Sequence, residues 1–85
     1  MTSSTKLQGQ YLAFIDAYTK VNGRPPAEAD MQRYFEVTPP VVHQMVINLH
    51  RLGLVNRSPG AARSLRVVIP QDDIPRLELR EQTPN

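Results

Sequence analysis

The 85-residue sequence contains no cysteine, no tryptophan and no long apolar run. Without cysteine, neither a disulfide nor a thiolate metal site can supplement the core of so small a chain. Nothing approaches the roughly 20 apolar residues that a membrane-spanning helix needs, and the polar segment Met1–Lys6 does not lead into the apolar stretch of a signal peptide. We therefore expect one small cytoplasmic domain without a membrane segment.

Acidic residues are absent from Val37 to Gln71, although the net charge of the whole chain is only +2. The first 36 residues balance four basic against four acidic side chains, and the last 14 residues are net acidic. A segregated basic segment favours a phosphate-bearing partner, whereas the alternative interpretation is an ordinary solvated surface. The cations of this segment are Arg51, Arg57, Arg63 and Arg66.

The sequence also lacks the patterns that indicate catalysis. There is no glycine-rich phosphate loop and no serine in a recognisable arrangement with a histidine. His43 and His50 are seven residues apart, but no third metal ligand accompanies them. We expect no enzyme activity, no cofactor, no metal and no small-molecule substrate.

Three helices are predicted in the first 52 residues. The first runs from about Thr5 to Val21 on a single apolar stripe, and Gly23 ends it. A short second helix covers Ala27 to Phe35, and a third covers Pro39 to Leu52 with Thr38 as its N-cap. Two helices joined by so tight a turn are typical of a helix-turn-helix unit.

A two-stranded hairpin is predicted after the third helix. Leu54–Arg57 forms its first strand, and Ser64–Ile69 alternates apolar and polar residues as a second strand. A bare hairpin is marginal in water, so it must pack on the helices. The predicted fold class is α+β, mainly α: a three-helix winged helix-turn-helix with a two-stranded β-hairpin wing.

The domain limits follow from these elements. Residues 1–4 form a flexible N-terminus, residues 5–69 the winged helix, and residues 70–85 a C-terminal tail that docks or dimerises. The apolar residues of the tail are expected to pack on this domain or on a second copy. They are Ile74, Leu77 and Leu79.

The segment Leu7 to Val68 resembles the DNA-binding domain of LexA-type repressors, which is a winged helix. The resemblance is carried by Gln10–Ile15, by Asn22–Pro26, by Thr38–Leu52 with the following Gly53-Leu54-Val55, and above all by the wing segment Pro59–Arg66. It implies sequence-specific binding of double-stranded DNA by a repressor-like transcriptional regulator, with a homodimer as the expected assembly.

Two departures from the family pattern limit what the resemblance implies. The turn before Thr38 is one residue shorter than in better-known members, so base contacts cannot be transferred one for one. No self-cleaving protease segment follows Ile69. We expect DNA binding to carry over and self-cleavage not to.

In a helix-turn-helix, the second helix of the unit enters the major groove. Its outward face holds the expected base-reading residues, in which Gln44 pairs with adenine, His43 donates to guanine and an apolar side chain touches a thymine methyl group. These residues are Pro40, Val41, His43, Gln44 and Ile47. The expected backbone and wing contacts are Thr38 with the free amides of the helix start, Arg51, Arg57, Arg63, Ser64 and Arg66.

Each of these assignments has an alternative. His43 and Gln44 can be solvated helix residues, and an exposed Ile47 is awkward beside DNA. The aromatic side chains are expected in the core rather than as platforms for nucleobases. A winged helix can also serve as a protein-interaction or dimerisation module, or bind DNA without sequence preference, and the salt dependence of binding separates these functions.

Overall fold

The first helix, α1 (Lys6–Asn22), owes its limits to the residues at its two ends. The N–H of Gln8 donates to Oγ1 of Thr5 over 3.1 Å, and the N–H of Thr5 donates to Oε1 of Gln8 over 2.9 Å. This reciprocal capping box satisfies two amides that a helix start leaves without a partner. At the other end, Gly23 adopts a left-handed φ of +75°, as its position after the apolar stripe predicts.

The second helix, α2 (Glu28–Phe35), is capped by a side chain from within its own first turn. Oδ2 of Asp30 accepts the N–H of Ala27 over 2.8 Å. The helix ends at Glu36, which adopts a positive φ of +57° without being glycine. Its successor Val37 donates its N–H to the carbonyl of Gln32 over 3.1 Å, which closes the tight turn into α3 (Pro39–Arg51).

The wing contains much shorter strands than the sequence predicts. Only Val55–Asn56 (β1) and Arg66–Val67 (β2) pair, antiparallel, with Val55 opposite Val67. The predicted Ser64–Ile69 strand cannot extend to its start because Arg63, next to it, adopts a left-handed φ of +56°. The predicted alternation is nevertheless confirmed, since Leu65 is buried and Val67 and Ile69 pack against the core.

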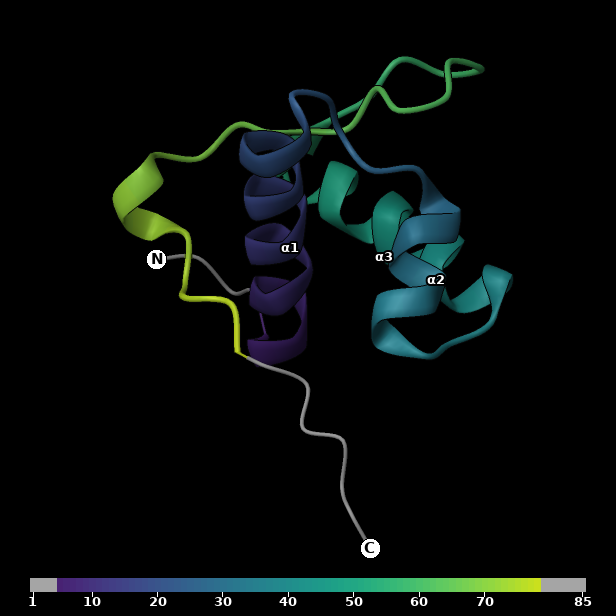
Figure 1. The fold of residues 1–85 in the computed structure, drawn as a ribbon, viewed down its shortest axis with the longest axis horizontal. Helices are drawn as coiled ribbons and strands as arrows, with labels where there is room; N and C mark the ends of the chain where they lie inside the picture. The colour runs from purple at the N-terminus through teal and green to yellow at the C-terminus, as the bar shows by residue number, and fades with distance from the viewer. Residues whose placement is uncertain (1–4, 79–85) are drawn as a thin grey trace, which may run out of the picture.

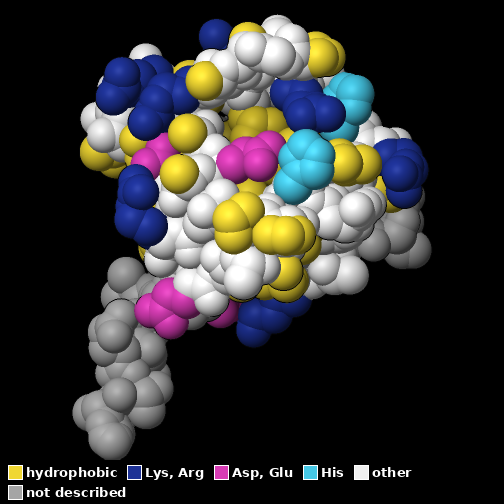
Figure 2. Space-filling model, turned by 90° about the vertical axis from the view of Figure 1, so that its right-hand side faces the viewer, with side chains coloured by type: hydrophobic (Ala, Val, Ile, Leu, Met, Phe, Trp, Pro, Cys, Tyr) yellow, Lys and Arg dark blue, Asp and Glu magenta, His cyan; other side chains and the backbone are white. Residues whose placement is uncertain are grey.

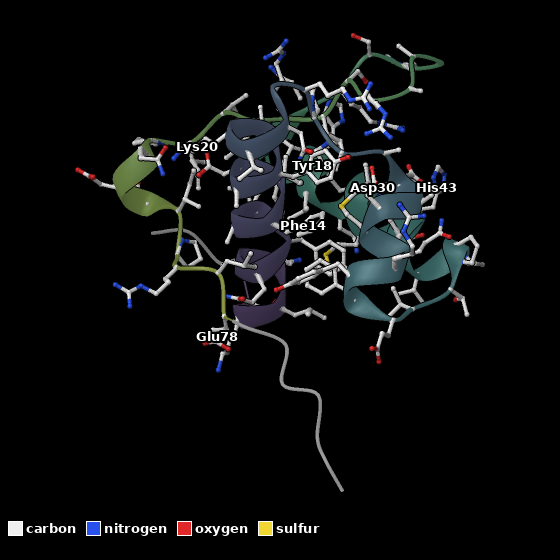
Figure 3. The ribbon with its side chains drawn as sticks, in the orientation of Figure 1. Phe14, Tyr18, Lys20, Asp30, His43 and Glu78 are labelled. Carbon is white, nitrogen blue, oxygen red and sulfur yellow. The ribbon has the colours of Figure 1, made fainter. Side chains whose placement is uncertain are left out.

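The computed structural model describes residues 5–78, and it confirms the predicted winged helix-turn-helix (Figure 1). One core joins the three helices and the base of the wing, with the ring of Tyr11 stacked on Phe35 at 4.0 Å between centroids. Tyr34 and Tyr18 pack against this core, as expected; Figure 3 labels Tyr18 on α1. The buried apolar side chains of the cluster are Tyr11, Leu12, Phe14, Ile15, Met31, Phe35, Val42, Val46, Leu49, Leu54, Val55 and Leu65.

The described part of the tail packs on its own domain. After the 3-10 turn η1 (Gln71–Asp73) it runs along α1, where Gln10 donates to the carbonyl of Arg76 over 3.0 Å and accepts the N–H of Glu78 over 2.8 Å (Figure 1). Leu77 packs against the core, and Ile74 is half-buried. Leu79, the third apolar residue of the predicted tail contact, lies outside the described residues.

Candidate nucleic-acid interface

The outer face of α3 presents the predicted base-reading residues. Burial of Val42, Val46 and Leu49 against the core fixes the rotation of this helix about its axis. Four of the five predicted residues are therefore exposed, namely Pro40, Val41, His43 and Gln44. Ile47 is half-buried, which removes the difficulty of an isoleucine fully exposed beside DNA.

Two polar side chains on this face are held by neighbours that the sequence analysis did not identify. Nε2 of Gln44 donates to Oδ1 of Asn48 over 3.0 Å, and Nδ1 of His43 lies 3.4 Å from Oε2 of Glu28. The spacing of four residues on a helix could have identified Asn48. Glu28 lies 15 residues from His43 in the sequence, on α2, and only the packing of the two helices brings it there.

The start of α3 differs from the expectation of free amides for a phosphate. Pro39 and Pro40 carry no N–H, and the N–H groups of Val41 and Val42 both donate to the carbonyl of Thr38, over 3.1 and 3.3 Å. The amide part of the predicted phosphate site is therefore wrong. Thr38 itself is exposed at the N-cap position, and its side chain makes no capping hydrogen bond.

Basic side chains surround the outer face of α3. Figure 2 shows Lys and Arg side chains on the side of the molecule that carries α2, α3 and the wing, with both histidines and acidic side chains among them. Arg51 and Arg66 are exposed, whereas Arg57 is half-buried. Arg51 is the last residue of α3, and Arg66 belongs to β2 of the wing.

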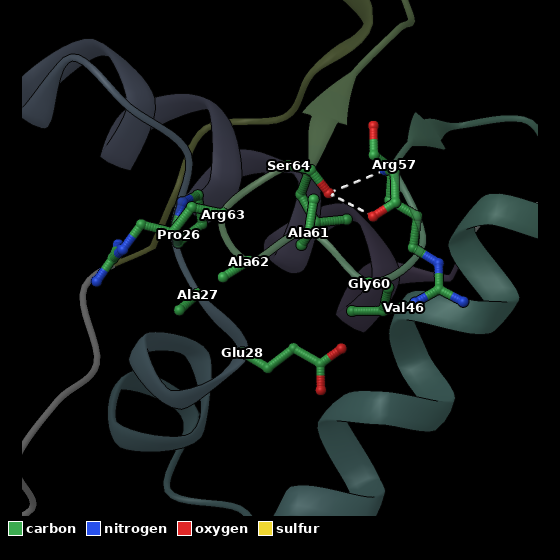
Figure 4. Close-up of a pocket in the computed structure, with 12 residues that line it drawn as sticks. Pro26, Ala27, Glu28, Val46, Arg57, Gly60, Ala61, Ala62, Arg63 and Ser64 are labelled. Carbon is green, nitrogen blue, oxygen red and sulfur yellow. Dashed lines mark hydrogen bonds between the residues drawn. The ribbon is translucent and has the colours of Figure 1, made fainter.

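The tip of the wing is stabilised within itself. Oγ of Ser64 accepts the N–H of Ser58 over 2.9 Å and donates to the carbonyl of Ser58 over 3.2 Å (Figure 4). The N–H of Ala61 donates to the same carbonyl over 3.0 Å. A hollow of about 320 Å³ lies between the wing, the first residues of α2 and the helix α3 (Figure 4). Glu28 and Arg57 both line this hollow.

Arg63 is on the wing, but its guanidinium contacts the helices rather than projecting freely. Nη1 lies 3.1 Å from the hydroxyl of Tyr18, 3.3 Å from the carbonyl of Pro25 and 3.0 Å from Oδ2 of Asp30. Figure 3 shows Tyr18 and Asp30 close together on α1 and α2. The sequence analysis grouped Arg63 with the other wing arginines, because nothing near it in the chain marks its partners.

Asp30 is a buried carboxylate with several donors. Its exposed fraction is 9%, and besides Arg63 and the N–H of Ala27 it pairs with Arg33 through Oδ1. Burial opposes ionisation of this carboxyl, but the Ala27 N–H, the Arg63 guanidinium, the Tyr18 hydroxyl and the Arg33 guanidinium together outweigh burial and hold its pKa below the ordinary 3.8. Asp30 therefore stays charged near neutral pH despite its burial.

Other kinds of site receive no support within residues 5–78. This part of the chain holds no group of three or more histidine, aspartate or glutamate side chains arranged for a metal ion. None of its helices combines the length and the apolar character that crossing a bilayer requires.

Comparison with known proteins decides the family. The sequence model described as "LexA DNA binding domain" matches residues 1–64. The chain belongs to this family. The resemblance to the LexA-type domain family is thereby confirmed.

Several curated relatives are named LexA repressor. The LexA-type domain is 35% identical to the protein from Thermosipho melanesiensis over 74 residues, which is 87% of this chain and 37% of that protein. It is 34% identical to the proteins from Thermosipho africanus and Thermotoga petrophila, over 80% and 79% of this chain and 34% of each relative. The chain thus spans little more than a third of the length of these relatives.

The lowered pKa of Asp30 predicts a pH-dependent stability of the LexA-type domain. Ionised Asp30 stabilises the fold above the ordinary pKa of 3.8, and this contribution is lost as the pH falls through the lower pKa of the folded state. At pH 7, Asp30→Asn should lower the free energy of unfolding by roughly 1–3 kcal/mol, since Arg63 and Arg33 lose a charged partner.

Denaturant unfolding of parent and Asp30→Asn between pH 7 and pH 3 tests this prediction. The difference in unfolding free energy between the two proteins should shrink as the pH falls below about 4. A difference that stays constant across this range would contradict the role given to the ionised carboxylate.

Proposed function

We propose that this chain binds double-stranded DNA at specific sequences and acts as a repressor-like transcriptional regulator. The observation that carries this proposal is the exposure of His43 and Gln44 together on the outer face of α3, in a chain of the LexA DNA-binding domain family. The proposed activity is binding alone, without catalysis. A DNA target also implies an intracellular location, which we propose to be the cytoplasm.

In the proposed complex, α3 lies in the major groove with its first turns against base edges. The amide of Gln44 can turn from Asn48 to pair with an adenine, through one acceptor and one donor. His43 donates to a guanine, and Val41 or Ile47 touches a thymine methyl group while Pro40 packs at the groove edge. Glu28 beside His43 limits the rotamers of this histidine, so less of its side-chain entropy is lost on binding.

The phosphate contacts are proposed on both sides of α3. Thr38 and Arg51 flank the helix, and Arg57, Ser64 and Arg66 approach the backbone from the wing. Arg66 is a clear candidate, because it is exposed and its side chain makes no hydrogen bond or ion pair within the described residues. Arg63 also lies on the wing, but its guanidinium contacts Tyr18 and Asp30 instead of being free at the surface.

We propose that residues 5–69 form the DNA-binding unit, with residues 1–4 and 70–85 as flanking segments. We also propose a homodimer on a two-fold symmetric site, since one domain of this size contacts too few bases for high specificity. The described tail contacts α1 of its own domain.

Replacing Gln44 by alanine should change which sequences the protein prefers. The bidentate pair with adenine contributes about 1–3 kcal/mol of discrimination, and Gln44→Ala should lose it at one base pair of each half-site. Competition among duplexes that differ at single positions measures this loss. Gln71→Ala, on the tail, is the matched control and should keep the parent preference. An unchanged preference in Gln44→Ala would show that this helix docks differently.

Replacing Arg66 by alanine should weaken binding to every duplex by a similar factor. Removing one phosphate contact lowers the slope of log affinity against log salt by about 0.9. A salt titration with a mixed-sequence duplex gives this slope. Arg76→Ala removes the same charge from the tail, beside α1, and should leave the slope unchanged. Equal slopes for Arg66→Ala and the parent would remove Arg66 from the interface.

The homodimer is tested by sedimentation of the protein alone and with a duplex. We expect two copies per duplex, because a two-fold symmetric site positions two domains side by side. Monomers only, both free and on DNA, would contradict the dimer while leaving the DNA-binding proposal intact.

A further inference from the structure

In the distal part of the wing, residues 58–64, a single side chain forms hydrogen bonds with the rest of the domain. Between the paired residues Asn56 and Arg66 the chain makes a long excursion supported by only two strand pairs. The hydrogen bonds of the tip join Ser58 with Ser64 and with Ala61, and so remain inside the wing. Among the hydrogen bonds of residues 58–64, those to the helices and to the segment between α1 and α2 all come from Arg63.

The geometry of Arg63 directs its charge into the domain. Its backbone adopts a φ of +56°, which a non-glycine residue adopts only where its surroundings hold it there. The guanidinium lies 6.0 Å from the centroid of the Tyr18 ring and donates to Tyr18, Pro25 and Asp30. The exposed fractions of the paired side chains are 32% for Arg63 and 9% for Asp30.

The carboxylate at the other end of this contact belongs to the helix-turn-helix unit. Asp30 caps α2 through the N–H of Ala27, so the same side chain fixes the start of α2 and receives the wing. The Arg63–Asp30 pair therefore connects the wing to the helix-turn-helix unit that α2 and α3 form. Arg66, only three residues further along the wing, is exposed and has no such partner within the described residues.

We propose that Arg63 is a positioning residue for the wing rather than a DNA contact. Its pairing with Asp30 holds the wing at a fixed angle to α3, so that Arg57, Ser64 and Arg66 reach the backbone without an ordering step on binding. The guanidinium of Arg63 already faces a buried carboxylate, so a phosphate would have to compete with Asp30 for it, and removing it would leave that carboxylate with Arg33 as its remaining cationic partner among the described residues. This inference rests on the proposed DNA binding.

A double-mutant cycle tests the proposal in the full chain. Affinity for one mixed-sequence duplex is measured for the parent, Arg63→Ala, Asp30→Asn and the double variant. Each single variant should bind roughly five- to tenfold more weakly, the range expected when a coupled pair of contacting residues is broken. The double variant should be no weaker than the weaker single variant, because both changes remove the same contact.

The salt dependence separates a positioning residue from a phosphate contact. Arg63→Ala should keep the parent slope of log affinity against log salt, whereas Arg66→Ala should lose about 0.9 of it. If Arg63 touches a phosphate instead, Arg63→Ala lowers the slope and Asp30→Asn binds DNA at least as well as the parent, since it loses a negative charge. That pair of results would overturn the proposal.

Amide hydrogen exchange in the free protein supplies a readout that does not depend on DNA. Exchange at Ser58 and Ala61 should accelerate in Arg63→Ala and Asp30→Asn, because the internal hydrogen bonds of a tip released from the helices are marginal in water and open more often. Arg33→Ala removes the other cation of Asp30 without touching the wing, and should leave exchange at these amides unchanged. Circular dichroism of each variant confirms that the helices remain folded.

These measurements distinguish the two proposals from each other. A parent protein that binds no duplex at low salt contradicts the proposed function, while accelerated exchange in the variants still supports the anchor. Parent-like exchange at Ser58 and Ala61 in both variants overturns the anchor, whatever the DNA affinity.

Discussion

The carboxylate of Asp30 joins the parts of this domain that have to act together. It caps α2 through the N–H of Ala27, pairs with Arg33 on the same helix and receives Arg63 from the wing. A charge this deeply buried is tolerable only because donors surround it, and each donor comes from a different segment or turn. One side chain thus fixes the start of the helix-turn-helix unit and the place of the wing beside it.

The position of the reading face follows from the core. Val42, Val46 and Leu49 are buried at helical spacing, so the rotation of α3 is set by apolar burial and leaves His43 and Gln44 outside. Burial stabilises the fold by about 1.5–3 kcal/mol for each aliphatic side chain. Rotating α3 so that these three side chains became exposed would therefore cost far more than any single base contact could offset. The residues that stabilise the fold and the residues proposed to read DNA therefore lie on opposite sides of the same helix.

Local patterns predicted the helices, the cap at Gly23 and the outward face of α3, because helix ends and helix faces are encoded within a few neighbouring residues. The strand lengths were overestimated, since apolar alternation does not reveal a left-handed residue such as Arg63. The expectation of free amides at the start of α3 was wrong, although the sequence itself shows that Pro39 and Pro40 have no N–H. Contacts between residues 15 or more positions apart, such as Glu28 with His43, could not be predicted from the sequence because only tertiary packing creates them.

The most direct test of DNA recognition is selection of the protein's preferred sites from a random duplex library, followed by sequencing. If a homodimer binds DNA at specific sequences, we expect an enriched two-fold symmetric sequence whose half-site centres lie one helical turn apart, roughly 34 Å. Recovery of duplex without any sequence preference, or no recovery even at low salt, would contradict it.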